Sequence, residues 1–233
     1  MKKKKIILDL CGGTGSWSLP YKNSGYKVIT ITLPDYDIRK TKIKDGHISF
    51  VGNEKSHLVV AKEIYGILAA PPCTMFSFAR TNAKKPRDLK EGMKCVRACL
   101  DIIWKVMEIK QDTKKKTLPL KFWALENPYF GFLKNFLGKP AFVFDPWEFG
   151  DGYKKRTALW GAFSEPVKSH KNQEEVLTKE QIEKHKTNSQ KLPKFDYMKS
   201  KDIHPEAFGV WDKQARRSIT PAGFAKAFFE SNL

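Results

Sequence analysis

Long apolar runs and a cysteine framework are both missing from this sequence of 233 residues. No stretch approaches the roughly 18 consecutive apolar residues that a membrane-spanning helix requires. The basic start is followed by only three apolar residues before Asp9 interrupts them, so a signal peptide is not expected. The four cysteines are too few and too unevenly spread for a disulfide scaffold, which favours a reducing cytoplasm.

Arginine is scarce, because only seven of the 43 basic residues are arginine. The 25 acidic residues nevertheless leave a formal net charge of +18. Such an excess favours a polyanionic partner, nucleic acid above all. A strong lysine bias is also what an AT-rich genome produces, so a merely soluble basic surface stays open as an alternative.

A hydrophobic fraction of 41% with 12% aromatic residues is enough for a real core, and it excludes disorder and a collagen-like chain. The length favours one domain. A brief helix carrying Trp17 and Tyr21 is expected between the first two strands, despite Pro20. Apolar runs bounded by turn residues predict strands at 5–10, 26–32, 65–70, 120–125, 141–144 and 157–160.

The clearest predicted helix begins near Pro86 and has one apolar stripe with spacings of four and three residues. Strands that alternate with helical segments predict an α/β fold with an open, mostly parallel sheet and helices on both faces. The stripe consists of Leu89, Met93, Val96, Leu100, Ile103 and Met107.

Composition divides the chain into three segments. Residues 1–163 carry all the predicted strands, whereas residues 164–201 are polar and lysine-rich and read as an insertion with one helix, capped at 178–181. Residues 202–233 are expected to pack back on the first segment through a helix that has Thr220 as its cap and Pro221 as its first position.

A glycine-rich turn, Cys11-Gly-Gly-Thr-Gly15, follows the first predicted strand. Such a turn lets backbone amides approach a ligand at the carboxyl edge of the sheet. Its spacing is neither that of the dinucleotide fingerprint nor that of the phosphate loop. A tight turn that needs only positive φ angles is the alternative.

Two further strands are predicted to end in groups that can react. Cys73 follows Pro71-Pro72 at the end of a central strand, a position that fits an activated thiolate. Cys95 and Cys99 lie on the long helix and are expected to be buried small hydrophobes. Glu126-Asn127 ends the next strand and delivers a carboxyl group to the same edge, which suits proton transfer, although a surface charge is the alternative.

A cationic cluster, Gly152-Tyr-Lys-Lys-Arg156, leads into the strand predicted at 157–160. By itself it reads equally well as a solvated basic loop. Together with the other motifs, in this order, it resembles the cytosine carbon-5 DNA methyltransferase family. The resemblance spans nearly the whole chain and depends on the joint occurrence of Pro-Pro-Cys and Glu-Asn. The matching segments are Asp9–Gly15, Pro71–Cys73 with Phe76-Ser77, Glu126-Asn127, Lys154 with Arg156, and Arg217–Pro221.

The resemblance implies a class I methyltransferase-like, Rossmann-type fold that uses S-adenosylmethionine, yields S-adenosylhomocysteine and needs no metal. It implies a monomer that acts on double-stranded DNA without a membrane. In these terms residues 1–163 are the catalytic and cofactor-binding domain and residues 164–201 a reduced target-recognition element. The small size is similar to that of phage-encoded members, which would place the protein in a host cytoplasm.

Residue by residue, the resemblance implies that a flipped-out cytosine accepts the Cys73 thiolate at carbon-6 while Glu126 hydrogen-bonds its nitrogen edge. Carbon-5 then takes the methyl group. The expected catalytic residues are Cys73, Glu126, Asn127, Lys154 and Arg156. The expected cofactor-binding residues are Asp9, Cys11, Gly13, Gly15, Ser16, Trp17, Asp37, Ile38 and Pro71.

Several positions depart from the family pattern. Cys11 replaces the aromatic residue expected on adenine, for which Trp17 is the substitute. The acidic residue expected at the end of the second strand is absent, which leaves Asp35 or Asp37 for the ribose. Lys154 stands where an arginine is usual and offers only a point charge.

The target-recognition element is the largest departure, because only about 55 residues separate Trp160 from Arg216. We therefore expect a broad or short target sequence. Two other functions remain open: an RNA cytosine-5 methyltransferase, and a catalytically silent nucleic-acid-binding module of the same fold.

Overall fold

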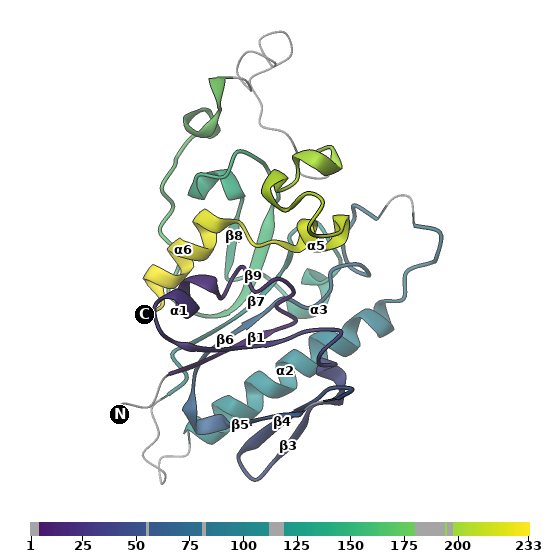
Figure 1. Ribbon diagram of the computed structural model, residues 1–233, viewed down its shortest axis with the longest axis vertical. Coiled ribbons are helices and arrows are strands. Elements are labelled where there is room, and N and C mark those ends of the chain that lie inside the picture. The colour runs from purple at the N-terminus through teal and green to yellow at the C-terminus, as the bar shows by residue number, and fades with distance from the viewer. Residues whose placement is uncertain (1–4, 55, 81–82, 112–118, 180–193, 195–197) are drawn as a thin grey trace.

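The computed structural model describes residues 5–54, 56–80, 83–111, 119–179, 194 and 198–233. A six-stranded sheet with the order β2-β1-β6-β7-β9-β8 forms its centre (Figure 1). All six strands predicted from apolar runs are present. They are β1 (Ile6–Leu10), β2 (Lys27–Ile31), β6 (Ile64–Ala69), β7 (Phe122–Pro128), β8 (Phe142–Phe144) and β9 (Thr157–Ala162).

The sheet is mostly parallel. Strands β2, β1, β6 and β7 pair in parallel, whereas β9 runs antiparallel to both of its neighbours, β7 and β8. The predicted α/β architecture is therefore confirmed. Strand order reverses at β1, which has β2 on one side and β6 on the other. Open α/β sheets bind ligands beyond the carboxyl ends of the strands at such a reversal.

Helices cover both faces of this sheet (Figure 1). The long helix α2 (Leu89–Gln111) packs on one face through Val96, Ile103 and neighbouring residues. Helices α1 (Leu19–Asn23) and α6 (Ala222–Ser231) cover the other, where the fully buried Tyr21 and Phe228 pack against Phe122 of β7. Burying a side chain of this kind stabilises the fold by about 1.5–3 kcal/mol.

A second, antiparallel sheet was not predicted from the sequence. It consists of β3 (Lys42–Lys44), β4 (His47–Val51) and β5 (Ser56–Val60), and it lies beside α2 at the lower edge of Figure 1. Its first hairpin turns through Asp45-Gly46, and both residues have positive φ angles. An Asp-Gly pair between two strands is the sequence signal for this turn. The strands themselves are half polar, which hid the signal.

Helix boundaries differ from the expectations in two places. Helix α2 begins at Leu89 rather than near Pro86, because the Asp88 carboxylate accepts a hydrogen bond from the Glu91 amide at 2.8 Å and caps the helix there. Pro221, not Thr220, is the N-cap of α6 and makes no side-chain cap bond. The short helices α3 (Lys134–Leu137) and α5 (Lys213–Ser218) were not expected.

The C-terminal segment is tied to the start of the polar segment. The Asn232 side chain accepts from the Ser164 amide at 2.8 Å and donates to the Ser164 carbonyl at 2.9 Å. The helix predicted with its cap at 178–181 lies largely outside the described residues. Within the ranges given above, no helix has the length and apolar character to cross a bilayer.

Candidate functional site

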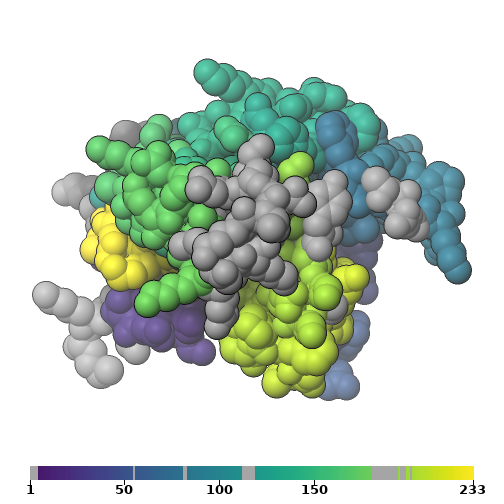
Figure 2. Space-filling model, turned by 90° about the horizontal axis from the view of Figure 1, so that it is seen from above, coloured from purple at the N-terminus to yellow at the C-terminus, as the bar shows by residue number. Residues whose placement is uncertain are grey.

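A cavity of about 1890 Å³ opens beyond the carboxyl ends of β1, β6 and β7. It is larger than the ~300–1,000 Å³ of a typical small-molecule site, so it has room for more than one ligand group. Figure 2 views the face that carries residues 164–179, in green, and residues 198–217, in yellow-green, and both segments contribute to the lining. Eleven predicted residues line the cavity: Asp9, Cys11, Gly13, Trp17, Asp37, Ile38, Pro71, Cys73, Glu126, Lys154 and Arg156.

The glycine turn has the strained backbone that its sequence predicts. Cys11, Gly13 and Gly15 have φ angles of 55°, 53° and 71°, a region that costs a non-glycine residue such as Cys11 free energy. Gly12 is required for a different reason. A Cβ atom there would lie 2.3 Å from Cγ of Asp9, so the turn can close only over a residue without a side chain.

Asp9 lies buried beneath this turn. Its Oδ2 accepts a hydrogen bond from the Ser18 hydroxyl at 2.5 Å, and its Oδ1 has no partner among the described residues. Burial raises the pKa of the carboxyl group to about 6, and the bond from Ser18 opposes the rise. Asp9 is therefore an acceptor with one oxygen left over for a ligand.

Three of the predicted cofactor-binding residues have mainly structural contacts in the glycine turn. They are Gly15, Ser16 and Trp17. Ser16 and Gly15 do not line the cavity. The Ser16 hydroxyl accepts the Thr220 amide at 2.8 Å and so ties the turn to the segment before α6. Trp17 borders the cavity, but it is 2% exposed and packs against Phe224 and Phe228 with centroid distances of 5.9 and 5.4 Å. It is thus a core residue rather than a free stacking surface for adenine.

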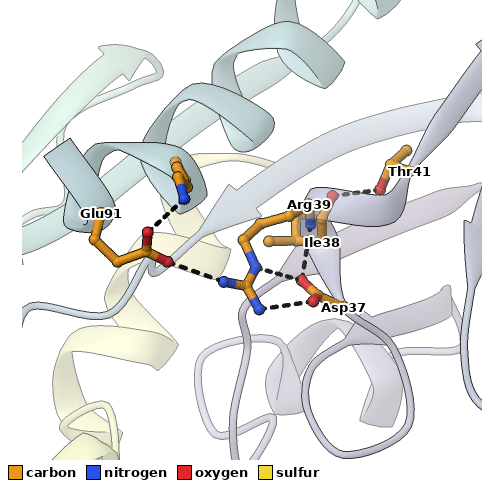
Figure 3. Close-up of polar contacts among 6 residues, drawn as sticks. Asp37, Ile38, Arg39, Thr41 and Glu91 are labelled. Atoms are coloured by element: carbon orange, nitrogen blue, oxygen red, sulfur yellow. Dashed lines mark hydrogen bonds and ion pairs between the residues drawn. The ribbon is translucent and has the colours of Figure 1, made fainter.

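Asp37 is engaged by its own neighbour (Figure 3). Its Oδ1 accepts from the amide and Nε of Arg39, at 3.0 and 2.8 Å, and its Oδ2 accepts from Nη2 at 2.8 Å. These bonds lower the pKa of Asp37. Arg39 also bonds Glu91 of α2 at 3.2 Å, and Glu91 pairs with Lys94. Both oxygens of Asp37, which the resemblance assigns to the ribose as an alternative to Asp35, therefore already accept hydrogen bonds from Arg39.

The other residues between β2 and Arg39 differ in whether they reach the cavity. Asp35, the alternative ribose ligand, is exposed and does not line the cavity. Ile38 does line it, together with Tyr36, which sequence reasoning missed. An aromatic residue followed two positions later by a branched aliphatic residue, in the turn that begins after β2, was the available signal. These two side chains form an apolar part of the cavity lining.

Cys73 lies in a turn after β6, exposed to the cavity. Its carbonyl accepts the amides of Phe76 and Ser77, both at 2.9 Å, which fixes the turn. Glu126 reaches the same cavity from β7, the strand paired with β6. Two strand ends thus deliver a thiol and a carboxyl group to one space, as predicted.

Both groups have raised pKa values. The Cys73 side chain is exposed to the cavity, but protein surrounds it on the other sides, and the causes are this partial desolvation first and the charge of Glu126 second, opposed by Lys155 and Arg217. For Glu126 the cause is burial, opposed by Lys155. A thiol and an acid in this environment hold their protons more firmly than in water, so each can exchange a proton when a substrate changes the local charge.

Asn127 has a different place from the one expected. Its side chain is buried, does not line the cavity, and donates from Nδ2 to the Pro71 carbonyl at 2.9 Å. Its Oδ1 has no partner within the described ranges. Asn127 therefore positions the loop before Cys73 instead of contacting a substrate.

The cationic segment contributes three neighbouring side chains to the cavity. Arg156 faces Asp145 at 3.7 Å and lies over the Tyr129 ring, 5.6 Å from its centroid. Lys155, which sequence reasoning did not single out, donates to the Arg217 carbonyl at 3.0 Å. Lys154 and Lys155 are adjacent and chemically identical in the sequence, so only the position within the family motif favours Lys154 as the site residue.

The other thiols are partly as expected. Cys99 is buried, but Cys95 lines the cavity and Cys11 Sγ lies 4.0 Å from Cys99 Sγ. In the part of the chain that the structure describes, no three His, Cys, Asp or Glu side chains are grouped to hold a metal ion. No protein-family model matches this chain, and no curated protein matches its sequence. Function is therefore inferred from the site itself.

Proposed function

We propose that this protein transfers a methyl group from S-adenosylmethionine to carbon-5 of cytosine in DNA. The observation that carries the proposal is the placement of Cys73 and Glu126. They stand at the ends of two paired strands and line one cavity, beside the strand reversal where α/β sheets bind cofactors. A nucleophile and an acid on one pyrimidine ring are what this reaction requires.

The residues near β1 suit the methyl donor. Asp9 and Trp17 border the cavity, and their buried atoms Oδ1 and Nε1 have no hydrogen-bond partner among the described residues. Asp9 Oδ1 can accept a hydrogen bond from the ammonium group of an amino-acid moiety, and Trp17 Nε1 can donate one to its carboxylate. Tyr36 and Ile38 would hold the purine. When bound, the donor supplies an electrophilic methyl group on a positively charged sulfur.

The residues of the chain then have defined tasks. Cys73 gives its proton to solvent and its sulfur bonds to carbon-6, which breaks the carbon-5–carbon-6 double bond and makes carbon-5 electron-rich. Glu126, whose pKa is raised by burial, donates a proton to nitrogen-3 so that negative charge does not accumulate on the ring. After methylation, a water molecule takes the carbon-5 proton, the electron pair left behind re-forms the carbon-5–carbon-6 double bond and expels the Cys73 thiolate, and nitrogen-3 returns its proton to Glu126.

The walls of the cavity suit a nucleic acid. Basic side chains surround it, including Arg80, Lys154, Arg156, Lys213 and Arg217. The exposed aromatic residues Phe130 and Trp211 also line it. Cations neutralise phosphates, while aromatic rings replace the stacking that a flipped base loses, a cost of a few kcal/mol. The same features would accept RNA, so substrate choice is part of the test.

Covalent trapping tests the proposal. In 5-fluorocytosine a fluorine atom replaces the hydrogen at carbon-5. Because no proton can be removed there after methyl transfer, elimination is blocked and the Cys73 adduct persists. We expect a denaturation-resistant adduct with duplex DNA and methyl donor, none with Cys73→Ser, and a normal adduct with Cys95→Ser. An adduct on structured RNA but not on DNA would favour RNA methylation. Absence of both adducts would contradict the proposal and favour a silent binding module.

A further inference from the structure

Cys73 must ionise to act as a nucleophile, yet its surroundings oppose ionisation. Burial and the negative charge of Glu126 both raise the pKa of the thiol. The opposing charges come from two elements: Lys155, on the segment that leads into β9, and Arg217, in the last turn of α5. The nucleophile thus depends on cations that come from regions distant in the sequence.

Lys155 is held more firmly than a surface lysine. Its side chain is partly buried and its Nζ donates to the Arg217 carbonyl at 3.0 Å. That carbonyl belongs to the C-terminal turn of α5, and the unpaired carbonyls of a helix end attract a cation. The position of the ammonium group is therefore set by the fold and not by solvent.

Lys155 also differs from its two neighbours. All three residues from Lys154 to Arg156 line the main cavity. Lys155 is the one of the three that also borders a small recess shared with Glu126, Ser218 and Thr220. Its charge is near both the acid and the thiol, and it opposes the rise in the pKa of each group.

We propose that Lys155, anchored on the Arg217 carbonyl, is the positioning residue whose positive charge allows the Cys73 thiolate to exist beside Glu126. Lys155 acts through Cys73 and needs no contact with the reacting carbons. Its catalytic meaning rests on the proposed function, but its effect on the thiol does not. Ionisation of Cys73 can be measured on the full chain without nucleic acid or methyl donor.

The experiment measures the rate at which iodoacetamide alkylates Cys73 between pH 6 and pH 10, with mass spectrometry to separate it from Cys11, Cys95 and Cys99. Lys155→Gln removes the charge but keeps a donor for the Arg217 carbonyl, so the link to α5 is preserved. We expect the alkylation midpoint to rise by about one pH unit. At pH 7.5 the rate should fall about tenfold.

Two further variants complete the design. Lys155→Arg restores the charge and should return the midpoint to the wild-type value. Lys171→Gln removes a positive charge from the lining of the same cavity and should leave the midpoint unchanged. Coincident profiles for wild type and Lys155→Gln, or an equal shift with Lys171→Gln, would overturn the inference. If Lys155→Gln shifts the midpoint but wild type forms no nucleic-acid adduct, the inference stands and the proposed function fails.

Discussion

Asp37 and Glu126 are both acids that line the cavity, and they lie in opposite electrostatic situations. Asp37 accepts three hydrogen bonds from Arg39, and its pKa is lowered. Glu126 is desolvated with Lys155 as its opposing charge, and its pKa is raised. The bonds from Arg39 keep Asp37 ionised, which suits a structural role. The desolvation of Glu126 leaves a proton available for transfer, which suits chemistry.

Asp9 lies between these two cases. Like Glu126 it is buried, with a pKa raised to about 6, but like Asp37 it receives a side-chain hydrogen bond. A buried acid with one unpaired oxygen gains most when a cation arrives. The contrast among the three acids gives a graded set of tests, which follow from the largest expected effect to the smallest.

Removing the nucleophile should have the largest effect. Cys73→Ser should abolish methyl transfer and adduct formation, because a serine hydroxyl at this position has no base to ionise it. Nucleic-acid affinity should stay near the wild-type value. Filter binding and incorporation of a labelled methyl group measure the two properties. Equal loss of both would mean that Cys73 supports the structure of the loop.

Replacing the buried acid should have the next largest effect. Glu126→Gln keeps the shape but cannot deliver a proton to the ring, so the turnover number should fall about 10²–10⁴-fold. Affinity for S-adenosylhomocysteine, measured by calorimetry, should change little. The matched change Asp37→Asn should reduce turnover far less, because both oxygens of Asp37 are already engaged by Arg39. Near-normal turnover of Glu126→Gln would remove it from the mechanism.

Asp9→Asn should separate binding from stability. Affinity for S-adenosylhomocysteine should fall about tenfold above pH 6, where the wild-type residue is charged, with Asp35→Asn as the control. The folded state binds the Asp9 proton more tightly than the unfolded state, so the wild type loses stability as the pH rises from about 4 to 6.

The variant should therefore be more stable than wild type above pH 6, by up to roughly 3 kcal/mol. Denaturant unfolding at pH 4 and pH 7.5 measures the difference. A variant that is equally destabilised at both values would show that the Ser18 bond outweighs the desolvation of the carboxylate.

Arg39→Gln should have the smallest effect. The ion pair with Asp37 is half exposed, so its loss should cost less than about 1 kcal/mol. A lowered pKa means that this stability is present above the ordinary pKa of an aspartate and is lost as the pH falls below it. The difference in Tm from wild type should therefore disappear towards pH 3. A difference that persists there would assign the effect to packing.

Most of the main sheet could be predicted because its strands are buried on both faces. A continuous apolar run such as Ile64–Ala69 has one stable place, between two layers of helices. The sheet β3-β4-β5 was not predicted because its strands bury only some of their residues, which leaves short mixed sequences of polar and apolar residues instead of continuous apolar runs. Helix α5 was not predicted because its six residues, all polar except Ala215, have no apolar periodicity.

The site divides in the same way. Local sequence determined that a thiol follows two prolines, that an acid ends the next strand, and that glycines follow the first, since strand ends and turns depend on neighbouring residues. Only the tertiary structure determined that Lys155 rather than Lys154 borders the recess with Glu126. It also determined that Arg39 donates hydrogen bonds to the Asp37 carboxylate and that the Asn127 side chain donates one to the Pro71 carbonyl. Side-chain direction, burial and partner charge are set by contacts between distant segments, and no local pattern encodes them.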